Sequence, residues 1–272
     1  GQMALTGQVD NYPGFEEGVD GLKLWERMRS GAERFGARTR FCTVSSVSLD
    51  GAVKQARAGE ETFEAPALVA ATGAAHRHLG VPGEEALTGR GVSYCAACDG
   101  MFFKGKTVVV VGGGNSAASD ALLLSRLCGR VFIVHRRDQL RADAVYRDQL
   151  ERAENVAFVW DSAVEAIRGE DLVTGVQIRE VRTGRTREIA AQGVFISIGL
   201  TPRSELFRDI LTLDEAGYIV ADESTQTNRP GVFAAGDVRA KPVRQIVTAV
   251  ADGAAAAHFA QAYLARGDGS TH

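Results

Sequence analysis

The chain contains 272 residues, of which 45% are hydrophobic and 24% charged, and its formal net charge is -3. This length indicates one large domain or two of ordinary size. Lys and Arg form no long run, which argues against binding to nucleic acid or an anionic membrane, and no apolar stretch approaches the ~20 residues that span a bilayer. Four cysteines and no secretory signal predict a cytoplasmic protein. The isolated Cys42 and Cys128 are predicted to be small buried residues.

The first part of the chain predicts a loop, one helix and several short strands. Residues 1–20 contain Gly, Asn and Pro without a helical period. Apolar residues from Leu22 to Ala32 recur at helical spacing. Alternating stretches within residues 38–65 predict a small β-meander, and residues 66–75 predict a buried strand that runs into a Thr-Gly turn.

From Lys106 onward the pattern is strand, glycine-rich turn, helix and strand. "KTVVVVGG" lacks polar alternation, as a parallel strand buried on both faces requires. "NSAASDALLLSRL" predicts a helix with Gly129 as its C-cap, and "RVFIVH" is the next strand, which completes a βαβ unit. Residues 141–153 predict another helix, residues 156–199 predict strands with a hairpin, and residues 231–265 predict a strand followed by a long helix.

Two changes of composition divide the chain. A linker with several glycines and one proline covers residues 76–91, and a second change falls near "GLTPRSELF". We therefore predict domain boundaries near these two stretches, which divide the chain into three segments.

The turn after the first strand of the βαβ unit contains a Gly-x-Gly-x-x-Ala pattern formed by Gly112, Gly114 and Ala117. The first glycine allows a tight turn, the second lets the backbone approach a pyrophosphate, and the small third residue lets helix and strand pack closely. The helix N-terminus, with Asn115 and Ser116, offers N–H groups to phosphates. The pattern predicts a dinucleotide site, although an ordinary glycine turn is the alternative.

The end of the second strand indicates which dinucleotide this would be. NAD sites usually have Asp or Glu there, whereas this chain has "HRRDQLRA", with His135, Arg136, Arg137 and Arg141. Guanidinium groups suit the 2′-phosphate of NADPH, which is therefore favoured over NADH. Asp138 argues for NADH, and a solvated basic turn is the alternative that needs no ligand.

Cys95 and Cys98 form a Cys-x-x-Cys pair with three interpretations. In a redox pair, the first thiolate can lie near a helix start, and Asp99 can exchange protons with a leaving thiolate. Half of a zinc site would need two further ligands, and His76 and His78 match no common zinc spacing, so we predict no metal. The third interpretation is a pair of buried bystanders.

A dithiol and a nicotinamide on one chain require an intermediate carrier, because a disulfide is a poor hydride acceptor; a flavin can fill that role. "GVFAAGDV" outlines a flavin site. Gly236 lets the backbone approach a ligand, and Asp237 can accept a hydrogen bond from a ribitol hydroxyl. Arg244 and Gln245 open a helix whose N-terminus can face a polar flavin edge. An ordinary strand-turn-helix would explain the same residues.

Taken together, "CAACDG", "GGGNSA", "HRRDQLRA", "GVFAAGDV…RQ" and the opening "GQ…TGQVDNYPGF" resemble the low-molecular-weight, bacterial-type thioredoxin reductases over essentially the whole chain. The resemblance implies a homodimeric α/β flavoprotein with two Rossmann-like, three-layer nucleotide-binding domains. The NADPH domain, residues 80–203, is inserted into the FAD domain, residues 1–79 and 204–272. Family members rotate one domain against the other, so that NADPH and the dithiol take turns at the flavin.

The resemblance also implies roles for individual residues. Electrons pass from NADPH to FAD, then to the Cys95–Cys98 disulfide, and then to oxidised thioredoxin or a thioredoxin-like protein. Cys98 meets the flavin, Cys95 attacks thioredoxin, and Asp99 is the acid. The positions that match FAD contacts are Gln2, Asn11, Thr72, Gly73, Gly236, Asp237, Arg244, Gln245 and Ile246.

Two departures from the family pattern stand out. Asn115 replaces the usual Asp, and we expect it to cap the helix that it opens. The strand, Gly-x-Gly-x-x-Gly turn and helix that grip the FAD pyrophosphate would precede Gly1, so we expect a fragment of an otherwise ordinary reductase. The alternatives are an alkyl hydroperoxide reductase-type flavoprotein that prefers NADH, a dithiol oxidase, an inactive NADPH-binding redox module and a zinc-binding structural module.

Overall fold

The computed structural model describes residues 1–6 and 8–267, which group into two compact units. The first unit comprises Gly1–Thr6, Tyr12–Ala75 and residues 200–267, and the second comprises residues 8–11 and His76–Gly199. The chain changes units a few residues before each predicted boundary. Residues 8–11 group with the second unit, whereas the sequence places them in the first segment.

The second unit is built on a five-stranded parallel sheet with the strand order β6-β13-β7-β8-β9. Val108, Val109 and Val110 are fully buried, because both faces of the sheet are covered. The predicted βαβ unit is therefore present. The strands are β6 (Val92–Ser93), β7 (Thr107–Val111), β8 (Arg130–Val134), β9 (Val156–Val159) and β13 (Gly193–Ile196).

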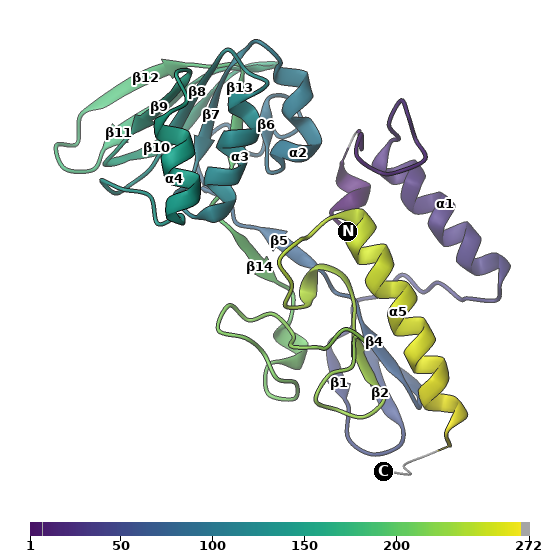
Figure 1. The fold of residues 1–272 in the computed structure, drawn as a ribbon. Helices are drawn as coiled ribbons and strands as arrows, with labels where there is room; N and C mark the ends of the chain where they lie inside the picture. Colours follow the sequence, from purple (N-terminus) through teal and green to yellow (C-terminus); the bar gives the residue numbers. More distant parts are fainter. Residues whose placement is uncertain (7, 268–272) are drawn as a thin grey trace. The chain divides into compact units, whose positions relative to one another are not determined.

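Each face of this sheet is covered by a different layer (Figure 1). On one face, Val108 packs in a cluster with Ala121 of α3 and Leu150 of α4. On the other face, Val109 packs in a cluster with Ile178 of an antiparallel sheet, β10-β11-β12. Adjacent residues of β7 thus point to opposite layers, which gives the predicted three-layer α/β arrangement. These layers contain α3 (Asn115–Ser125), α4 (Ala144–Glu151), β10 (Ser162–Gly169), β11 (Val173–Glu180) and β12 (Thr186–Ala190).

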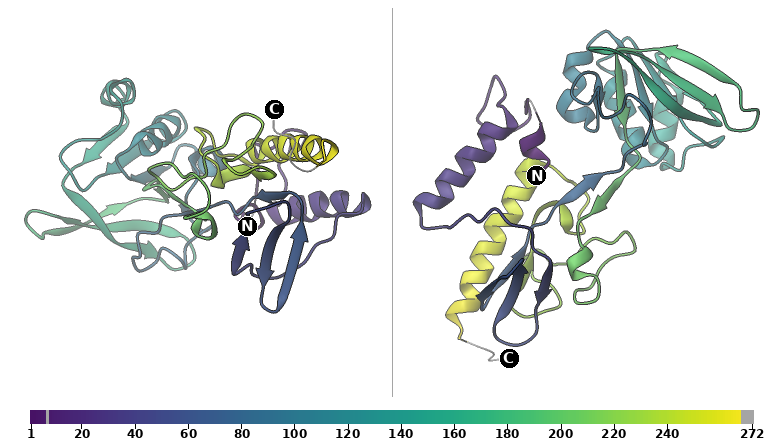
Figure 2. Two further views of the ribbon diagram at one scale, coloured as in Figure 1. Left: turned by 90° about the horizontal axis from the view of Figure 1, so that it is seen from below. Right: turned by 180° about the vertical axis from the view of Figure 1, so that it is seen from behind.

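The first unit contains a parallel pair of strands, β4 (Leu68–Ala70) and β15 (Val232–Ala234), beside the long helix α5 (Ile246–Ala265). Phe233 packs against Ala256 of α5, whereas Val232 points to the other face and packs in a cluster with Ile219. Figure 2 shows α5, in yellow, running along the strands of this unit. The predicted closing strand and long helix are both present.

The rest of the first unit is the predicted helix and meander. Asp20 caps α1 (Gly21–Arg34), because its carboxylate accepts a hydrogen bond from the N–H of Lys23 at 2.9 Å. The meander consists of β1 (Ser46–Ser48), β2 (Lys54–Ala58) and β3 (Glu61–Ala65). Three short 3₁₀ turns are η1 (Met3–Leu5), η3 (Glu205–Phe207) and η4 (Gly236–Val238).

The ends of the second unit lie beside each other. β5 (Ala74–His76) pairs with β14 (Leu200–Pro202) where the chain passes between the units. The N–H of Arg77 donates a hydrogen bond to the carbonyl of Gly199 at 3.0 Å. The segment between them is therefore an insertion with adjacent ends.

Three local predictions were wrong. Gly129 is not a C-cap, since α3 ends at Ser125; a Cβ at Gly129 would lie 2.7 Å from the carbonyl oxygen of Gly105, so a close backbone approach requires glycine there. Cys42 is exposed, although Cys128 is buried as predicted. The strand predicted in residues 66–75 is the short β4, and its Val69 is exposed.

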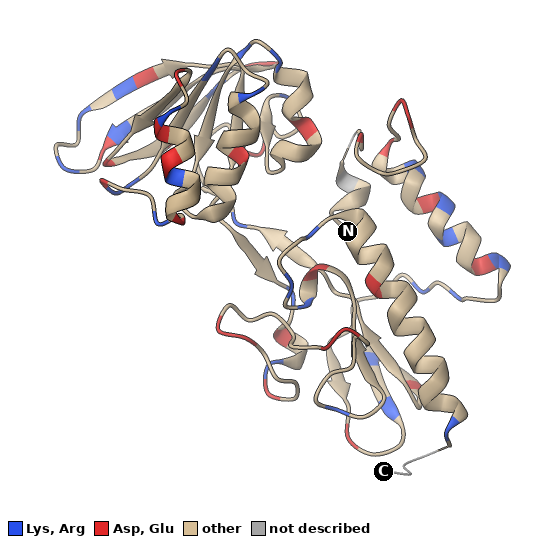
Figure 3. Ribbon diagram, in the orientation of Figure 1, with Lys and Arg blue, Asp and Glu red and all other residues tan. Residues whose placement is uncertain are grey.

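Acidic and basic side chains are interspersed along the described elements, as α1 illustrates (Figure 3). In the described part of the chain, none of the helices combines the length and apolar character needed to cross a membrane.

Candidate functional site

The glycine-rich turn follows β7 and leads into α3. A Cβ on Gly112 would lie 2.4 Å from the carbonyl oxygen of Ser197, and a Cβ on Gly113 would lie 2.2 Å from the ring of His135. Both positions therefore require glycine. A Cβ on Gly114 would meet nothing within 4 Å, so the turn is open where α3 begins. Ala117 is fully buried against the sheet, as close packing of helix and strand demands.

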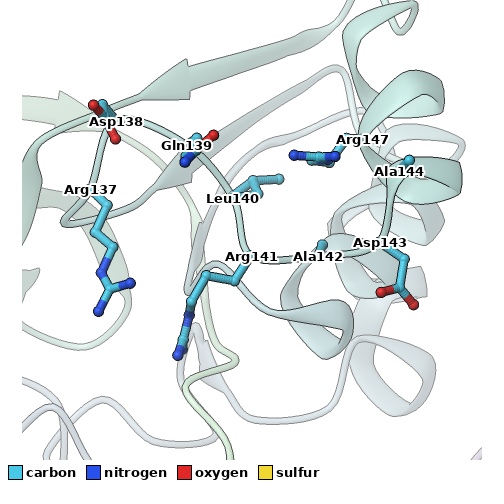
Figure 4. A pocket seen from close by; sticks show the side chains of 9 residues that line it. All are labelled: Arg137, Asp138, Gln139, Leu140, Arg141, Ala142, Asp143, Ala144 and Arg147. Carbon is cyan, nitrogen blue, oxygen red and sulfur yellow. The ribbon is translucent and has the colours of Figure 1, made fainter.

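The arginine loop follows β8 and lies against this turn. The N–H of Arg141 donates a hydrogen bond to the carbonyl of Gly113 at 2.7 Å. A cavity of about 610 Å³ is lined by Arg137, Arg141 and their neighbours up to Arg147. Figure 4 shows the side chains of Arg137 and Arg141 extending from the loop toward the same side. The loop thus presents guanidinium groups next to the open glycine turn.

His135 is buried at the start of this loop. Burial lowers the pKa of His135, and the guanidinium groups of Arg141, Arg137 and Arg136 lower it further. The imidazole is therefore neutral at physiological pH, and the positive charge of the loop resides on the arginines. Among the described residues, nothing bonds to its Nε2 atom.

Two residues near the glycine turn and the arginine loop bond to partners far along the chain. Asp138 pairs with Arg182, with an N–O distance of 3.7 Å, rather than with the arginines of its own loop. Asn115 does not cap α3, whose N-cap is Gly114. Its amide instead donates to the carboxylate of Asp143 at 2.9 Å and accepts the Asp143 N–H at 2.8 Å, which ties the starts of α3 and α4 together.

The residues present fit a bound NADPH. Its pyrophosphate can lie at the open Gly114 turn and the exposed Ser116, at the N-terminus of α3. Its 2′-phosphate can meet Arg136, Arg137 and Arg141.

The two cysteines of the Cys-x-x-Cys pair are joined by a disulfide. Cys95 is the N-cap of the short helix α2 (Ala96–Asp99), and Asp99 is its last residue. Burial raises the pKa of Asp99, a hydrogen bond from Ser93 opposes that rise, and the charge of Asp10 adds to it. A partly buried carboxyl with a raised pKa, one residue after a disulfide cysteine, can act as a general acid.

The dithiol, the glycine turn and the arginine loop lie along one edge of the same sheet. They follow β6, β7 and β8, respectively, and these strands run parallel within the five-stranded sheet. The carboxyl ends of parallel strands share one edge, where open α/β sheets place their ligands. The second unit therefore holds both the disulfide and the candidate nucleotide site on one sheet.

A group in the first unit lies at the corresponding edge of β4 and β15. Thr72 and Gly73 follow β4, and Gly236 and Asp237 follow β15. The hydroxyl of Thr72 donates to the carbonyl of Arg203 at 2.5 Å, which fixes the turn. Because β4 and β15 pair in parallel, the two turns lie at the same end of the pair.

The side chains of this edge fit a flavin. Asp237 Oδ1 is buried and has no hydrogen-bond partner among the described residues, so it is free to accept from a ribitol hydroxyl. Burial raises the pKa of Asp237, while Lys241 and Arg244 lower it. The guanidinium of Arg244 lies 3.8 Å from the ring centroid of Tyr218.

The remaining predicted FAD positions lie at element ends. Gln245 and Thr248 form a capping box at the start of α5, and Ile246 is the first residue of that helix. Gln2 is the N-cap of η1 in the first unit. Asn11 groups with the second unit, apart from the other positions.

Several residues that support the site have no signal in the sequence patterns. Ser93 links Asp99 to the backbone of Cys95. Glu84 is buried and accepts hydrogen bonds from the Tyr94 hydroxyl at 2.7 Å and from the Gly80 N–H at 2.7 Å.

Asp252 of α5 supports the edge at which β4 and β15 end, and the sequence patterns did not indicate it. It accepts from the Gly236 N–H at 2.9 Å and pairs with Arg239 and Lys241, each at 2.8 Å. The segment "GDVRAK" contains the two cations, Arg239 and Lys241, at close spacing. No pattern in the neighbouring sequence indicates that Asp252 is their partner.

The sequence matches the family described as pyridine nucleotide-disulphide oxidoreductase over residues 1–253. It is 47% identical to a thioredoxin reductase of Listeria monocytogenes over 97% of this chain and 83% of the relative, and 48% identical to one of Streptomyces clavuligerus with the same coverage. The crystal structure of a Streptococcus pyogenes thioredoxin reductase superposes with a TM-score of 0.91 at 42% identity, covering 98% of this chain and 87% of the other.

The chain belongs to the thioredoxin reductase family. The predicted resemblance and fold class are confirmed, and with them the class of reaction, the reduction of a disulfide by a pyridine nucleotide. FAD and NADPH are the cofactors of thioredoxin reductases. The disulfide between Cys95 and Cys98 fits that chemistry.

Proposed function

We propose that this chain is an NADPH-dependent thioredoxin-disulfide reductase in which Cys95 and Cys98 carry the electrons and Asp99 the proton. The observation that carries the proposal is the edge shared by β6, β7 and β8, which places the dithiol, the glycine turn and the arginine loop on one sheet. The relatives' name, thioredoxin reductase, supports thioredoxin or a thioredoxin-like protein as the acceptor.

The second unit binds NADPH. The N–H groups at the start of α3 hold the pyrophosphate, and Gly112, Gly114 and Ala117 keep the turn close to the helix. Arg136, Arg137 and Arg141 hold the 2′-phosphate. His135 stays neutral beneath Gly113 and sets the position of the loop.

The first unit holds FAD, which when bound relays the two electrons of a hydride from NADPH to a disulfide. Gly236, Asp237 and the start of α5 contact the flavin half. The positions assigned to FAD by resemblance are Gln2, Asn11, Thr72, Gly73, Arg244, Gln245 and Ile246.

Reduction of the acceptor is a thiol–disulfide exchange. The Cys95 thiolate attacks one sulfur of the acceptor disulfide and forms a mixed disulfide, and the other acceptor sulfur leaves as a thiolate that takes a proton from Asp99. The Cys98 thiolate then attacks Cys95, which restores the Cys95–Cys98 disulfide and releases the second acceptor thiolate. The dithiol is oxidised and the acceptor is reduced by two electrons.

The proposal extends to assembly and location. We assign a homodimer, supported by the resemblance to the family and by the exposed apolar residues of α5, Val247, Val250 and Leu264. We assign the cytoplasm, whose reducing conditions suit a dithiol enzyme with the free cysteines Cys42 and Cys128. The interspersed charges favour neither nucleic acid nor a membrane surface as a partner (Figure 3).

Cys98→Ser tests the function. With FAD added, the variant should lose NADPH-dependent reduction of thioredoxin, because the exchange cannot be completed, yet NADPH should still bleach the flavin absorbance under anaerobic conditions. Cys42→Ser, which removes an exposed thiol in the first unit, is the matched control and should turn over normally.

Parental thioredoxin turnover in Cys98→Ser would remove the dithiol from the reaction. Three further results would favour the alternatives. Oxygen consumption without thioredoxin indicates a dithiol oxidase, and a preference for NADH indicates an alkyl hydroperoxide reductase-type enzyme. NADPH binding without flavin binding indicates an inactive redox module.

A further inference from the structure

Ser93 is a buried polar residue beside the dithiol that has no role in the reaction described above. It is the last residue of β6 and is 5% exposed. Its hydroxyl lies 2.6 Å from Asp99 Oδ2, 3.1 Å from the Cys95 nitrogen and 3.4 Å from the Cys95 oxygen. All three partners belong to the dithiol segment.

The donors and acceptors define the direction of these bonds. A serine hydroxyl has one proton and two lone pairs. The proton goes to the Asp99 carboxyl, which is the nearest acceptor, and a lone pair accepts the Cys95 N–H. The N–H of Asp99 donates in turn to the Cys95 carbonyl at 3.1 Å. The three hydrogen bonds form a closed ring through Ser93, Cys95 and Asp99.

We propose that Ser93 is a positioning residue for disulfide reduction, which acts by holding the Asp99 carboxyl against the backbone of Cys95. This inference rests on the proposed function, because it concerns the acid of the same dithiol. The ring gives Asp99 one orientation relative to the sulfur that it serves.

The groups around Asp99 act in opposite directions. Burial and the nearby Asp10 carboxylate both raise the pKa of Asp99. The hydrogen bond donated by the Ser93 hydroxyl lowers it. Glu84 is another acidic residue near this segment. Its carboxylate accepts hydrogen bonds from the Tyr94 hydroxyl and from the N–H groups of Leu79 and Gly80. Loss of the Ser93 hydroxyl therefore moves the pKa of Asp99 in one direction, upward.

That direction matters for turnover. Asp99 must give its proton to a leaving thiolate and regain one in every cycle. If its pKa rises, the carboxyl releases the proton less readily, and the catalytic efficiency of a general acid depends on a pKa near the working pH. Ser93 thus keeps Asp99 able to give up its proton as well as to hold it.

The test is a carboxyl titration of the oxidised 272-residue chain, which needs neither FAD nor NADPH. Protein labelled with ¹³C at the Asp side chains is titrated by NMR, and the Asp99 signal is assigned by its absence in Asp99→Asn. Ser93→Ala should raise the midpoint of Asp99. Ser93→Thr, which keeps the hydroxyl, should leave it near the parental value.

Ser197→Ala is the matched control. Ser197 donates a hydrogen bond to the partly buried Asp120 carboxyl at 2.5 Å and opposes the rise that burial causes in the pKa of Asp120. The second unit therefore contains an equivalent pair away from the dithiol. This variant should raise the midpoint of Asp120 and leave Asp99 unchanged. Ser93→Cys, with a weak donor of similar size, replaces Ser93→Ala if the alanine variant does not fold.

The inference is overturned if the Asp99 midpoint stays at the parental pH in Ser93→Ala or Ser93→Cys, or if Ser197→Ala moves it equally. It is also overturned if Ser93→Thr raises the Asp99 midpoint as much as Ser93→Ala does, since loss of the hydroxyl would then not be the cause of the shift. A chain that binds no flavin would fail as a reductase yet still give these titrations, so the two failures are distinguishable.

Discussion

The contact between Gly113 and His135 couples the two halves of the nucleotide site. The imidazole fills the space that a Cβ on Gly113 would need, and the Arg141 N–H bonds to the Gly113 carbonyl. The arginine loop is therefore held against the glycine turn by backbone and ring contacts, whatever the conformations of the guanidinium groups. Substitution of an arginine can change what the loop binds without moving the loop itself.

Replacing Arg136 and Arg137 together with alanine should erode the preference for NADPH over NADH. Guanidinium groups pair with a 2′-phosphate that NADH lacks, and losing ~1.4 kcal/mol of such binding is a tenfold change, so the ratio of kcat/KM values should fall by about tenfold or more. Steady-state kinetics with both nucleotides measure it. Arg126→Ala, which removes an exposed arginine at the end of α3, is the control; an unaltered ratio in the double variant would refute the 2′-phosphate assignment.

Glu84 organises the segment that leads into β6. Its buried carboxylate accepts from the Tyr94 hydroxyl and from the N–H groups of Leu79 and Gly80, at 2.7, 3.0 and 2.7 Å. Tyr94 immediately precedes Cys95 and stacks on His76 with 4.9 Å between ring centroids. A single side chain thus connects the first residues of the second unit to the start of the dithiol segment.

Glu84→Ala should lower the free energy of unfolding by about 1–3 kcal/mol, because it removes a buried carboxylate and leaves the partly buried donors Tyr94 and Leu79 without their acceptor. Urea unfolding followed by circular dichroism measures this change. The adjacent, exposed Glu85 supplies the control, and Glu85→Ala should stay within about 0.5 kcal/mol of the parent. Equal losses in both variants would contradict the role of Glu84.

The contribution of Glu84 to stability should also depend on pH. Burial raises the pKa of Glu84, but the hydrogen bonds from Tyr94 and the backbone N–H groups together lower it below the ordinary value. A carboxyl with a depressed folded pKa stabilises the protein fully above its unfolded pKa, about 4.3, and loses that contribution as the pH falls through the folded pKa. The difference in the free energy of unfolding between the parent and Glu84→Ala should therefore decrease at acidic pH and stay constant at basic pH.

Local patterns in the sequence predicted the elements, but not the contacts between them. The valine run, glycine turn and helix of residues 106–127 are a contiguous signal, and the structure contains that βαβ unit. Gly129 was misassigned because its need for glycine comes from the carbonyl of Gly105, across the end of the helix. Asn115 bonds to Asp143, 28 residues away, so a capping argument limited to its own helix could not find that partner.

In the candidate site, too, sequence patterns indicate some residues and leave out others. Cys95, Cys98 and the arginine loop have residue types and spacings that indicate their chemistry. Ser93 and Asp252 have neither, since an isolated serine or aspartate acquires a role only through neighbours that the fold supplies. Supporting residues of a site are consequently the part that sequence patterns leave out.

The molecule as a whole has two units with separate cores. Clusters around Val109 and Val108 cover the two faces of the sheet in the second unit, and a cluster around Ile219 fills the first. A ligand that binds one unit stabilises that unit by mass action. The two units can therefore respond separately to their ligands.

Hydrogen exchange measures that separation. Saturating NADPH should slow amide exchange in residues 107–141, by up to about 100-fold at a concentration 100 times its Kd, and should leave the meander of residues 46–65 unchanged. Mass spectrometry of the full chain reads out both segments. The variant with Arg136 and Arg137 replaced by alanine should lose most of the protection, and equal protection of residues 46–65 would contradict independent units.

The adjacent ends of the second unit have a consequence for how such enzymes diversify. The unit enters the chain at β5 and leaves it at β14, and these strands pair with each other, with Arg77 bonded to Gly199. Because the two ends of the inserted unit lie together, recombination that exchanges the unit needs to preserve only the pairing of β5 with β14. Chimaeras joined at these two strands would transplant a complete dithiol and nucleotide cassette, so a change of electron donor or acceptor does not require the rest of the molecule to be rebuilt.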